Sequence, residues 1–197
     1  MVEINEYYSI LKGSDNPLSC DVAIIKGKNH NYIFEVGSLD SIAEELNSID
    51  NKIIIISHFH NDHIANLNKL KYDELYIGDN TYKYTKTGNI VTSDIILEDN
   101  IRLFKINCCH ALGSIGMIVS DYCFVGDSLA PAYKNNNYVY NVQLLKKEIE
   151  LFESLDVRYF VDSHNMDKYY EKGKVINKLK QIYNRRQKSN PYIVCEN

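Results

Sequence analysis

The order of secondary structure that the sequence predicts is that of an α/β protein, in which two groups of strands are each followed by a helix. Short runs of β-branched and aromatic residues alternate with segments whose apolar residues recur at helical spacing. Two of the runs, 53–56 and 159–161, are continuously apolar, which is typical of strands that are covered on both faces. Two sheets packed face to face, with helices on the outside, would satisfy this order.

The first half of the chain predicts four strands and one helix. The strands are expected at 20–26, 32–36, 53–56 and 75–77. Between the second and third strands, one helical face is marked by Leu39, Ile42, Ala43 and Leu46. Ser38 or Ser41 is the expected N-terminal cap of this helix.

The second half predicts four more strands and two longer helices. The strands are expected at 101–106, 115–119, 122–125 and 159–161, with Asp121 in a hairpin turn. Amphipathic helices are expected at 141–155 and 175–183. We see no internal repeat, so the 197 residues are interpreted as a single domain spanning 1–197.

Composition and charge exclude several classes of protein. Hydrophobic residues make up 45% of the chain and charged residues 24%, which is ordinary for a globular domain. The net charge of −4 disfavours a protein that binds nucleic acid through its phosphates. Five cysteines without C-x-x-C spacing indicate reduced thiols, and no signal peptide or membrane span is visible. We therefore expect a cytoplasmic protein with a small-molecule substrate and no membrane or nucleic-acid partner; its oligomeric state is not predicted.

Three of the six histidines fall within six residues, directly after the buried strand 53–56. His58 and His60 are two apart in an extended segment, so their imidazoles point the same way and can bind one ion. Asp62 and His63 lie beyond the bend and can face a second ion. Imidazole and carboxylate ligands suit zinc, and also iron or manganese.

Further ligand-type side chains recur at the ends of other predicted strands. His110 follows the strand 101–106, Asp127 follows 122–125, and His164 follows 159–161. The alternative interpretation is a polar loop with solvated histidines, but this recurrence favours ligands that converge on one sheet edge. Only His30 lies apart, in an early turn.

These segments resemble the motifs of the metallo-β-lactamase superfamily. Ser57-His-Phe-His-Asn-Asp-His63 is similar to its H-x-H-x-D-H signature, and Cys109-His-Ala-Leu-Gly-Ser114 to its G-H-T-x-G-S segment. Phe124-Val-Gly-Asp-Ser128 is similar to the F-x-G-D element, and His164 to the last ligand. The resemblance extends from about residue 21 to residue 164, with the motifs in family order and spacing.

The resemblance implies a four-layer αβ/βα sandwich with a two-metal site at one sheet edge. It implies that the first ion, expected to be zinc, is held by His58, His60 and His110. It implies that the second is held by Asp62, His63 and His164, while Asp127 bridges both ions. Asp62 and Asp127 would be the catalytic carboxylates, and a bridging hydroxide would attack the substrate.

Two departures from the family pattern are visible. Glu35-Val-Gly37 stands where members usually have an Asp-Thr-Gly-like element, so the carboxylate there is one methylene longer. Cys109 and Ala111 flank His110 where glycine and threonine are usual. Packing explains Cys108 and Cys109 better than ligation or redox sensing does.

The preferred function is that of a compact hydrolase of small esters or thioesters, similar to hydroxyacylglutathione hydrolase (glyoxalase II) without its C-terminal domain. Three alternatives remain, namely an iron-dependent persulfide dioxygenase, a phosphodiesterase or nuclease, and a non-catalytic metal-binding or signalling module. Tyr138, Tyr140, Tyr169 and Tyr170 flank the last motifs and could contact a substrate. The lysine- and arginine-rich stretch 168–188 is interpreted as a solvated helix face.

Overall fold

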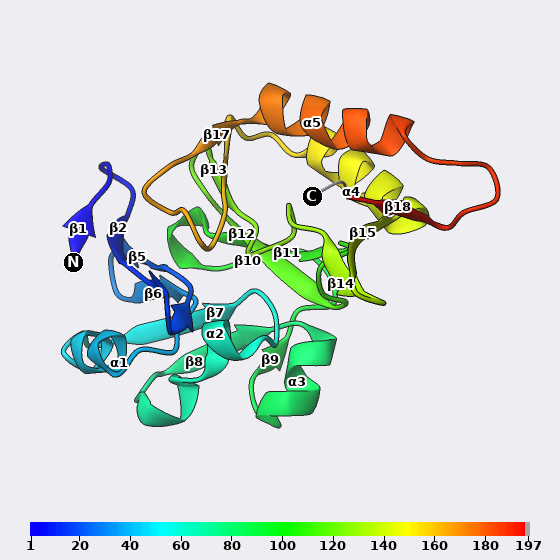
Figure 1. Ribbon diagram of the computed structural model, residues 1–197. Coiled ribbons are helices and arrows are strands. Elements are labelled where there is room, and N and C mark those ends of the chain that lie inside the picture. The colour runs from blue at the N-terminus through cyan, green and yellow to red at the C-terminus, as the bar shows by residue number, and fades with distance from the viewer. Residues whose placement is uncertain (196–197) are drawn as a thin grey trace.

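Two β-sheets packed face to face form the centre of the molecule, and helices cover their outer faces (Figure 1). The computed structural model describes residues 1–195. The seven-stranded sheet has the order β1 (Val2–Glu3), β2 (Ser9–Leu11), β5 (Val22–Lys26), β6 (Asn31–Phe34), β7 (Lys52–Ile56), β8 (Glu74–Ile77), β9 (Asn89–Ile90). The six-stranded sheet has the order β10 (Ile95–Ile96), β11 (Arg102–Ile106), β12 (Ser114–Val119), β13 (Tyr122–Phe124), β16 (Tyr159–Val161), β17 (Tyr170–Glu171).

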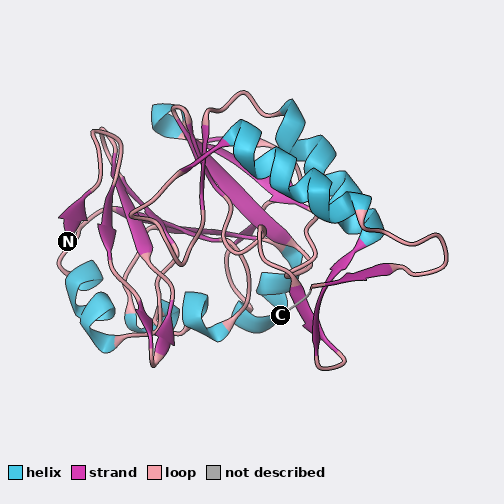
Figure 2. Ribbon diagram, turned by 45° about the horizontal axis from the view of Figure 1, so that its top comes forward, coloured by secondary structure: helices cyan, strands magenta, loops and turns pink. Residues whose placement is uncertain are grey.

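Helices of each half of the chain lie on opposite outer sides of the two sheets (Figures 1 and 2). The first sheet carries α1 (Asp40–Asn47), α2 (Asn61–Ile64) and α3 (Asp79–Thr85). The second is covered by α4 (Val142–Ser154) and α5 (Lys172–Asn184), which lie side by side. None of the helices within residues 1–195 has the length and apolarity that a membrane crossing requires.

Three hydrophobic cores separate the four layers, and the central strands contribute to two cores each. In β7, Ile53 and Ile55 face the core between the sheets, whereas Ile54 and Ile56 face the core under α1. The same alternation places Phe124 between the sheets and Cys123 against α4 and α5. A strand with apolar neighbours on both faces needs apolar residues at every position, which explains the continuous run 53–56.

All eight predicted strands and all three predicted helices are present, and the predicted αβ/βα sandwich is confirmed. The predicted cap of α1 is wrong, because the N-cap residue is Leu39 and no side chain caps the helix. The sequence interpretation missed α3 and a small sheet of β14 (Ala132–Lys134), β15 (Asn137–Asn141) and β18 (Tyr192–Val194). It also missed the hairpin of β3 (Ser14–Asp15) and β4 (Leu18–Ser19).

Glu148 is a buried carboxyl on the inner face of α4, and among residues 1–195 neither of its oxygens has a hydrogen-bond partner. Burial raises its pKa well above the ordinary value of 4.5. Above about pH 4.5 the unfolded chain releases this proton, whereas the folded protein keeps it. The free energy of unfolding therefore decreases as the pH rises above this value.

We expect Glu148→Gln to be more stable than the parent at pH 8 and to gain less at pH 5, because the amide has no charge to bury. Urea unfolding at both pH values measures the difference. Identical pH dependence of the two proteins would show that Glu148 does not carry this penalty.

Candidate metal centre

The loops that follow β7, β13 and β16 meet at one edge of the sandwich. β13 and β16 are parallel neighbours, so their carboxyl ends lie together. The Ser163 amide donates to the Gly126 carbonyl at 3.2 Å, and the Ile115 amide of the second sheet donates to the Ser57 carbonyl of the first at 2.9 Å. This edge brings the ligand-type residues of all the predicted motifs together.

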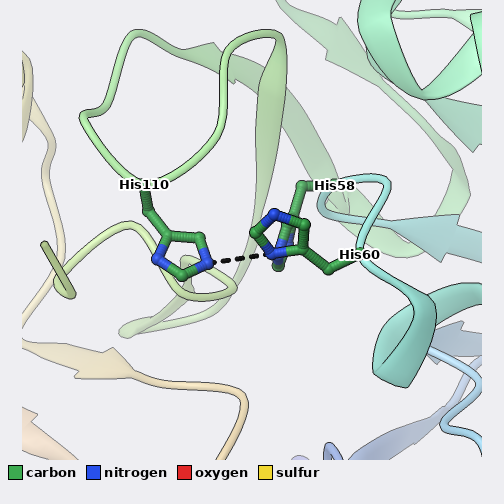
Figure 3. Close-up of side chains that lie close together, drawn as sticks. All are labelled: His58, His60 and His110. Atoms are coloured by element: carbon green, nitrogen blue, oxygen red, sulfur yellow. Dashed lines mark hydrogen bonds between the residues drawn. The ribbon is translucent and has the colours of Figure 1, made fainter. Parts of the chain in front are cut away.

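His58, His60 and His110 form the first group of converging ligand atoms. His60 Nδ1 lies 2.9 Å from His58 Nε2 and 3.0 Å from His110 Nε2. Figure 3 shows the three rings turned so that these nitrogens face one another. His58 is fully buried, while His60 and His110 are partly exposed.

A hydrogen bond made by His110 leaves its other ring nitrogen with a free lone pair that faces the other two histidines. His110 Nδ1 lies 3.2 Å from the Pro131 carbonyl oxygen, which can only accept, so Nδ1 carries the proton. In the neutral ring, His110 Nε2 then carries a free lone pair that points at His60 Nδ1. Burial and the neighbouring histidines lower the pKa of His58 and of His60, which keeps both rings neutral.

Asp62, His63, Asp127 and His164 form the second group. Asp62 Oδ2 lies 3.2 Å from the Nε2 atoms of His63 and His164. Asp127 Oδ2 lies 3.4 Å from the same two atoms and also 3.4 Å from His110 Nε2 of the first group. One carboxylate oxygen is therefore shared by the two groups.

The charges of the second group are paired with each other. Burial opposes ionisation of Asp62 and Asp127, but the close imidazole rings of His164 and His63 lower the pKa of both carboxyls. The same proximity to Asp127 and Asp62 raises the pKa of His164 to about 10. Positive charge on these rings thus lies where two carboxylates converge, which is also where a cation would be stabilised.

The donor atoms fit metal ions. Ligands around a tetrahedral ion with bonds of about 2.0–2.1 Å are about 3.3 Å apart, close to the separations found here. Within residues 1–195, Asp127 Oδ1 and both ring nitrogens of His63 are buried without a hydrogen-bond partner. Neutral imidazoles and ionised carboxylates are ligands for zinc, iron and manganese. The two groups form a candidate metal-binding cluster, and the assignment of each ligand remains a prediction.

Glu35 lies beneath the second group and contacts its surroundings through both carboxylate oxygens. The Ser57 amide donates to Oε2 at 3.2 Å, and the Ser163 hydroxyl donates to Oε1 at 3.1 Å. Oε1 is also 3.2 Å from His63 Nδ1. The glutamate side chain therefore contacts the ring of His63 and also Ser57 and Ser163, which precede His58 and His164. Glu35 is thus placed to fix the orientation of these three histidines.

We expect Glu35→Gln to weaken binding at the second group by about 10–100-fold, because the amide lacks the negative charge that faces His63 Nδ1. Calorimetric titration with zinc measures both binding events. Glu148→Gln, another buried carboxyl, is the matched control and should leave the second event unchanged. Parent-like binding in Glu35→Gln would contradict a positioning role.

The remaining sequence candidates lie outside the two groups. Cys108 and Cys109 are buried in the core under α4 and α5, and burial raises their pKa values to about 11 and about 12. Their thiols are therefore protonated, as expected for packing residues. His30 Nδ1 lies 3.6 Å from Glu98 and is not part of either group.

No protein-family model and no curated protein matches the sequence. Solved structures do match the fold over most of the chain. The metallo-β-lactamase SMB-1, bound to 2-mercaptoethanesulfonate, has a TM-score of 0.70 at 12% identity, covering 91% of this chain and 93% of its own. The chemotaxis sensor ODP, in a peroxy diiron species, has a TM-score of 0.66 at 16% identity, covering 91% and 92%. ETHE1 from Myxococcus xanthus has a TM-score of 0.65 at 14% identity, covering 91% and 85%.

These likenesses show that the chain has the metallo-β-lactamase fold. At the edge where the loops meet, it carries a cluster of histidines and aspartates with the geometry of a metal site.

Proposed function

We propose that this protein is a metal-dependent hydrolase of a small ester or thioester, a compact counterpart of hydroxyacylglutathione hydrolase. The observation that carries the proposal is the position of Asp127 Oδ2, which is 3.4 Å from ring nitrogens of both ligand groups. A shared carboxylate favours two ions held side by side. Zinc is the proposed metal, with His58, His60 and His110 at one ion, Asp62, His63 and His164 at the other, and Asp127 between them.

Two divalent ions bound here would lower the pKa of water and polarise the carbonyl oxygen of a substrate. The chain's residues supply the rest. Neutral His58 and His60 can bind a cation without first losing a proton. Asp62 and Asp127 are ionised and face the centre, so their negative charges would stabilise the bound cations.

Access to the centre also supports turnover. His60, His110 and His164 are partly exposed, with 27% of the His164 side chain accessible, whereas His58 and His63 are buried. One side of the ligand cluster therefore faces solvent and the other faces the core. This is the arrangement that a substrate needs in order to reach the ligands while their orientation stays fixed.

The test is a panel of thioester, lactone, β-lactam and phosphodiester substrates with zinc-loaded protein, with and without oxygen. We expect hydrolysis of a thioester or lactone that needs no oxygen and stops with chelator. Its rate should rise with pH through an apparent pKa of about 7, as deprotonation of water in such a site requires. Cleavage of only the phosphodiester would move the reaction class to phosphoryl transfer.

Iron and oxygen chemistry is the second candidate, since imidazole and carboxylate also suit iron. The structural likeness to a sensor studied as a peroxy diiron species, and to ETHE1, favours including it. Metal analysis of protein purified with and without oxygen distinguishes the candidates. Iron, oxygen uptake with a persulfide and no acyl hydrolysis would select a dioxygenase. Full metal occupancy without any turnover would select a binding or signalling module.

A further inference from the structure

A cavity of about 380 Å³ lies between the segment that follows Asp127 and the first half of α5. Ligand pockets in proteins commonly have volumes of about 300–1,000 Å³. Leu129, Pro131 and Leu179 contribute apolar surface to this cavity, and Lys174 and Lys178 contribute charge. We call it the lysine pocket.

Two residues that line the lysine pocket form hydrogen bonds with residues of the candidate metal centre. The Pro131 carbonyl accepts from His110 Nδ1 at 3.2 Å. On another wall, Asp162 Oδ1 accepts from the amide of His164 at 2.9 Å. Two residues that line the pocket therefore hydrogen-bond directly to candidate ligands, one in each group.

The lysines of α5 are divided between two faces of the helix. Lys172 donates to the Glu153 and Leu155 carbonyls, and Lys180 pairs with Glu153, so these two point towards α4. Lys174 and Lys178 are one helical turn apart and line the pocket. α5 carries no acidic residue.

Little within the described chain neutralises the two pocket lysines. Lys174 has one exposed ion pair, with Glu171 at 3.1 Å, and such pairs contribute little free energy. Lys178 has no ion pair within residues 1–195. Asp162 is the acidic group of the pocket, and one of its oxygens is occupied by the His164 amide. The whole chain has a net charge of −4, but this pocket combines two lysines with apolar lining residues. Its surface is therefore complementary to an organic anion.

We propose that the lysine pocket binds the anionic end of the substrate, a carboxylate or a phosphate joined by an apolar chain to the reacting group. The substrate is then an ester or thioester that carries a negative charge at a distance from its acyl carbon. The identity of the reacting group rests on the function proposed above, whereas the binding of the anion does not. The stretch 168–188, interpreted from sequence as a solvated face, supplies two specificity residues.

Binding tests the anion site without turnover. The probes are 4-(methylthio)butanoate, its carboxamide and 2-(methylthio)ethyl phosphate, titrated calorimetrically into the chain as purified. We expect a charged probe to bind at least several-fold more tightly than the carboxamide, with weaker binding at high salt. The variant Lys174→Gln/Lys178→Gln should weaken this binding about tenfold, the sum of two modest ion pairs.

The matched control is Lys146→Gln/Lys147→Gln on α4, which removes the same charge and also contains one lysine paired along its helix, with Glu150. It should bind as the parent does. Preference for the carboxylate or for the phosphate identifies the anion. Equal binding by parent and pocket variant, or no preference over the carboxamide, would overturn the proposal.

Steady-state kinetics with charged and neutral substrates test the pocket proposal and the hydrolase proposal separately. For S-acetyl thioesters of a carboxylate-bearing thiol and of its carboxamide, the pocket variant should raise KM about tenfold for the charged substrate only and leave kcat unchanged. If anion binding depends on the lysines but no acyl substrate is cleaved, the pocket stands and the hydrolase assignment falls. If the charged and neutral thioesters are cleaved with equal kcat/KM, the hydrolase stands and the pocket proposal falls.

Discussion

Replacement of Asp127 by alanine is expected to deplete metal from both ligand groups together and to lower acyl hydrolysis by about a thousandfold or more. Asp127 Oδ2 is 3.4 Å from His110 in the first group and from His63 and His164 in the second, so its charge stabilises cations at both positions. Loss of metal removes several kcal/mol of transition-state stabilisation, and each 1.36 kcal/mol is a factor of ten in rate. Metal content after dialysis and initial rates measure the two effects.

His164→Ala and His30→Ala complete this experiment. The His164 ring lies 3.2 Å from Asp62 and 3.4 Å from Asp127 of the second group, so its loss should lower metal binding mainly there. His30 lies beside Glu98 and should change neither metal content nor rate. If Asp127→Ala retains parent-like metal and activity, the shared role of this carboxylate is wrong.

Gly78→Ala is expected to destabilise the protein by about 3 kcal/mol or more and to weaken metal binding at the first group. Gly78 follows β8, and a Cβ atom there would lie 1.6 Å from the carbonyl oxygen of Gly113. The backbone of residue 78 fixes the position of the Cβ atom, and its neighbour is a backbone oxygen, so no change of rotamer relieves the contact. Gly113 belongs to the loop that carries His110, and Asn80 holds the same loop through the Leu112 carbonyl.

Urea unfolding and zinc titration of Gly78→Ala measure the two consequences. The control is Gly173→Ala on α5, where a Cβ atom meets nothing within 4 Å. Alanine has the higher helix propensity, so this variant should be as stable as the parent or more stable by up to about 1 kcal/mol. A Gly78→Ala protein with parent stability would show that the loop moves without cost.

Much of the fold could be predicted because its central strands have a distinctive pattern. Strands with cores on both faces are continuously apolar, as in β7, and the helices over them are amphipathic. The small sheet of β14, β15 and β18 was missed because its residues are largely exposed and polar, with Tyr133 and Tyr138 outward. The cap of α1 was wrong because Leu39 takes the N-cap position without any side-chain hydrogen bond.

The candidate site could be predicted because its ligands are adjacent to strand ends, whereas the groups around it are distant in sequence. His58, His60 and His63 are close along the chain, but the contact of Glu35 with Ser163 joins residues 128 positions apart. Nor could the sequence show that Lys174 and Lys178 line one cavity with Pro131. Such contacts depend on tertiary packing, and only the charge pattern of α5 gave a signal.

The number and position of bound metal ions test the central claim most directly. Zinc titration of the metal-free chain, followed by anomalous diffraction from crystals of the loaded protein, measures both. The account predicts two ions per chain, one at His58, His60 and His110 and the other at Asp62, His63 and His164, with Asp127 bound to both. A single ion under excess zinc, with Asp62 uncoordinated, would contradict it.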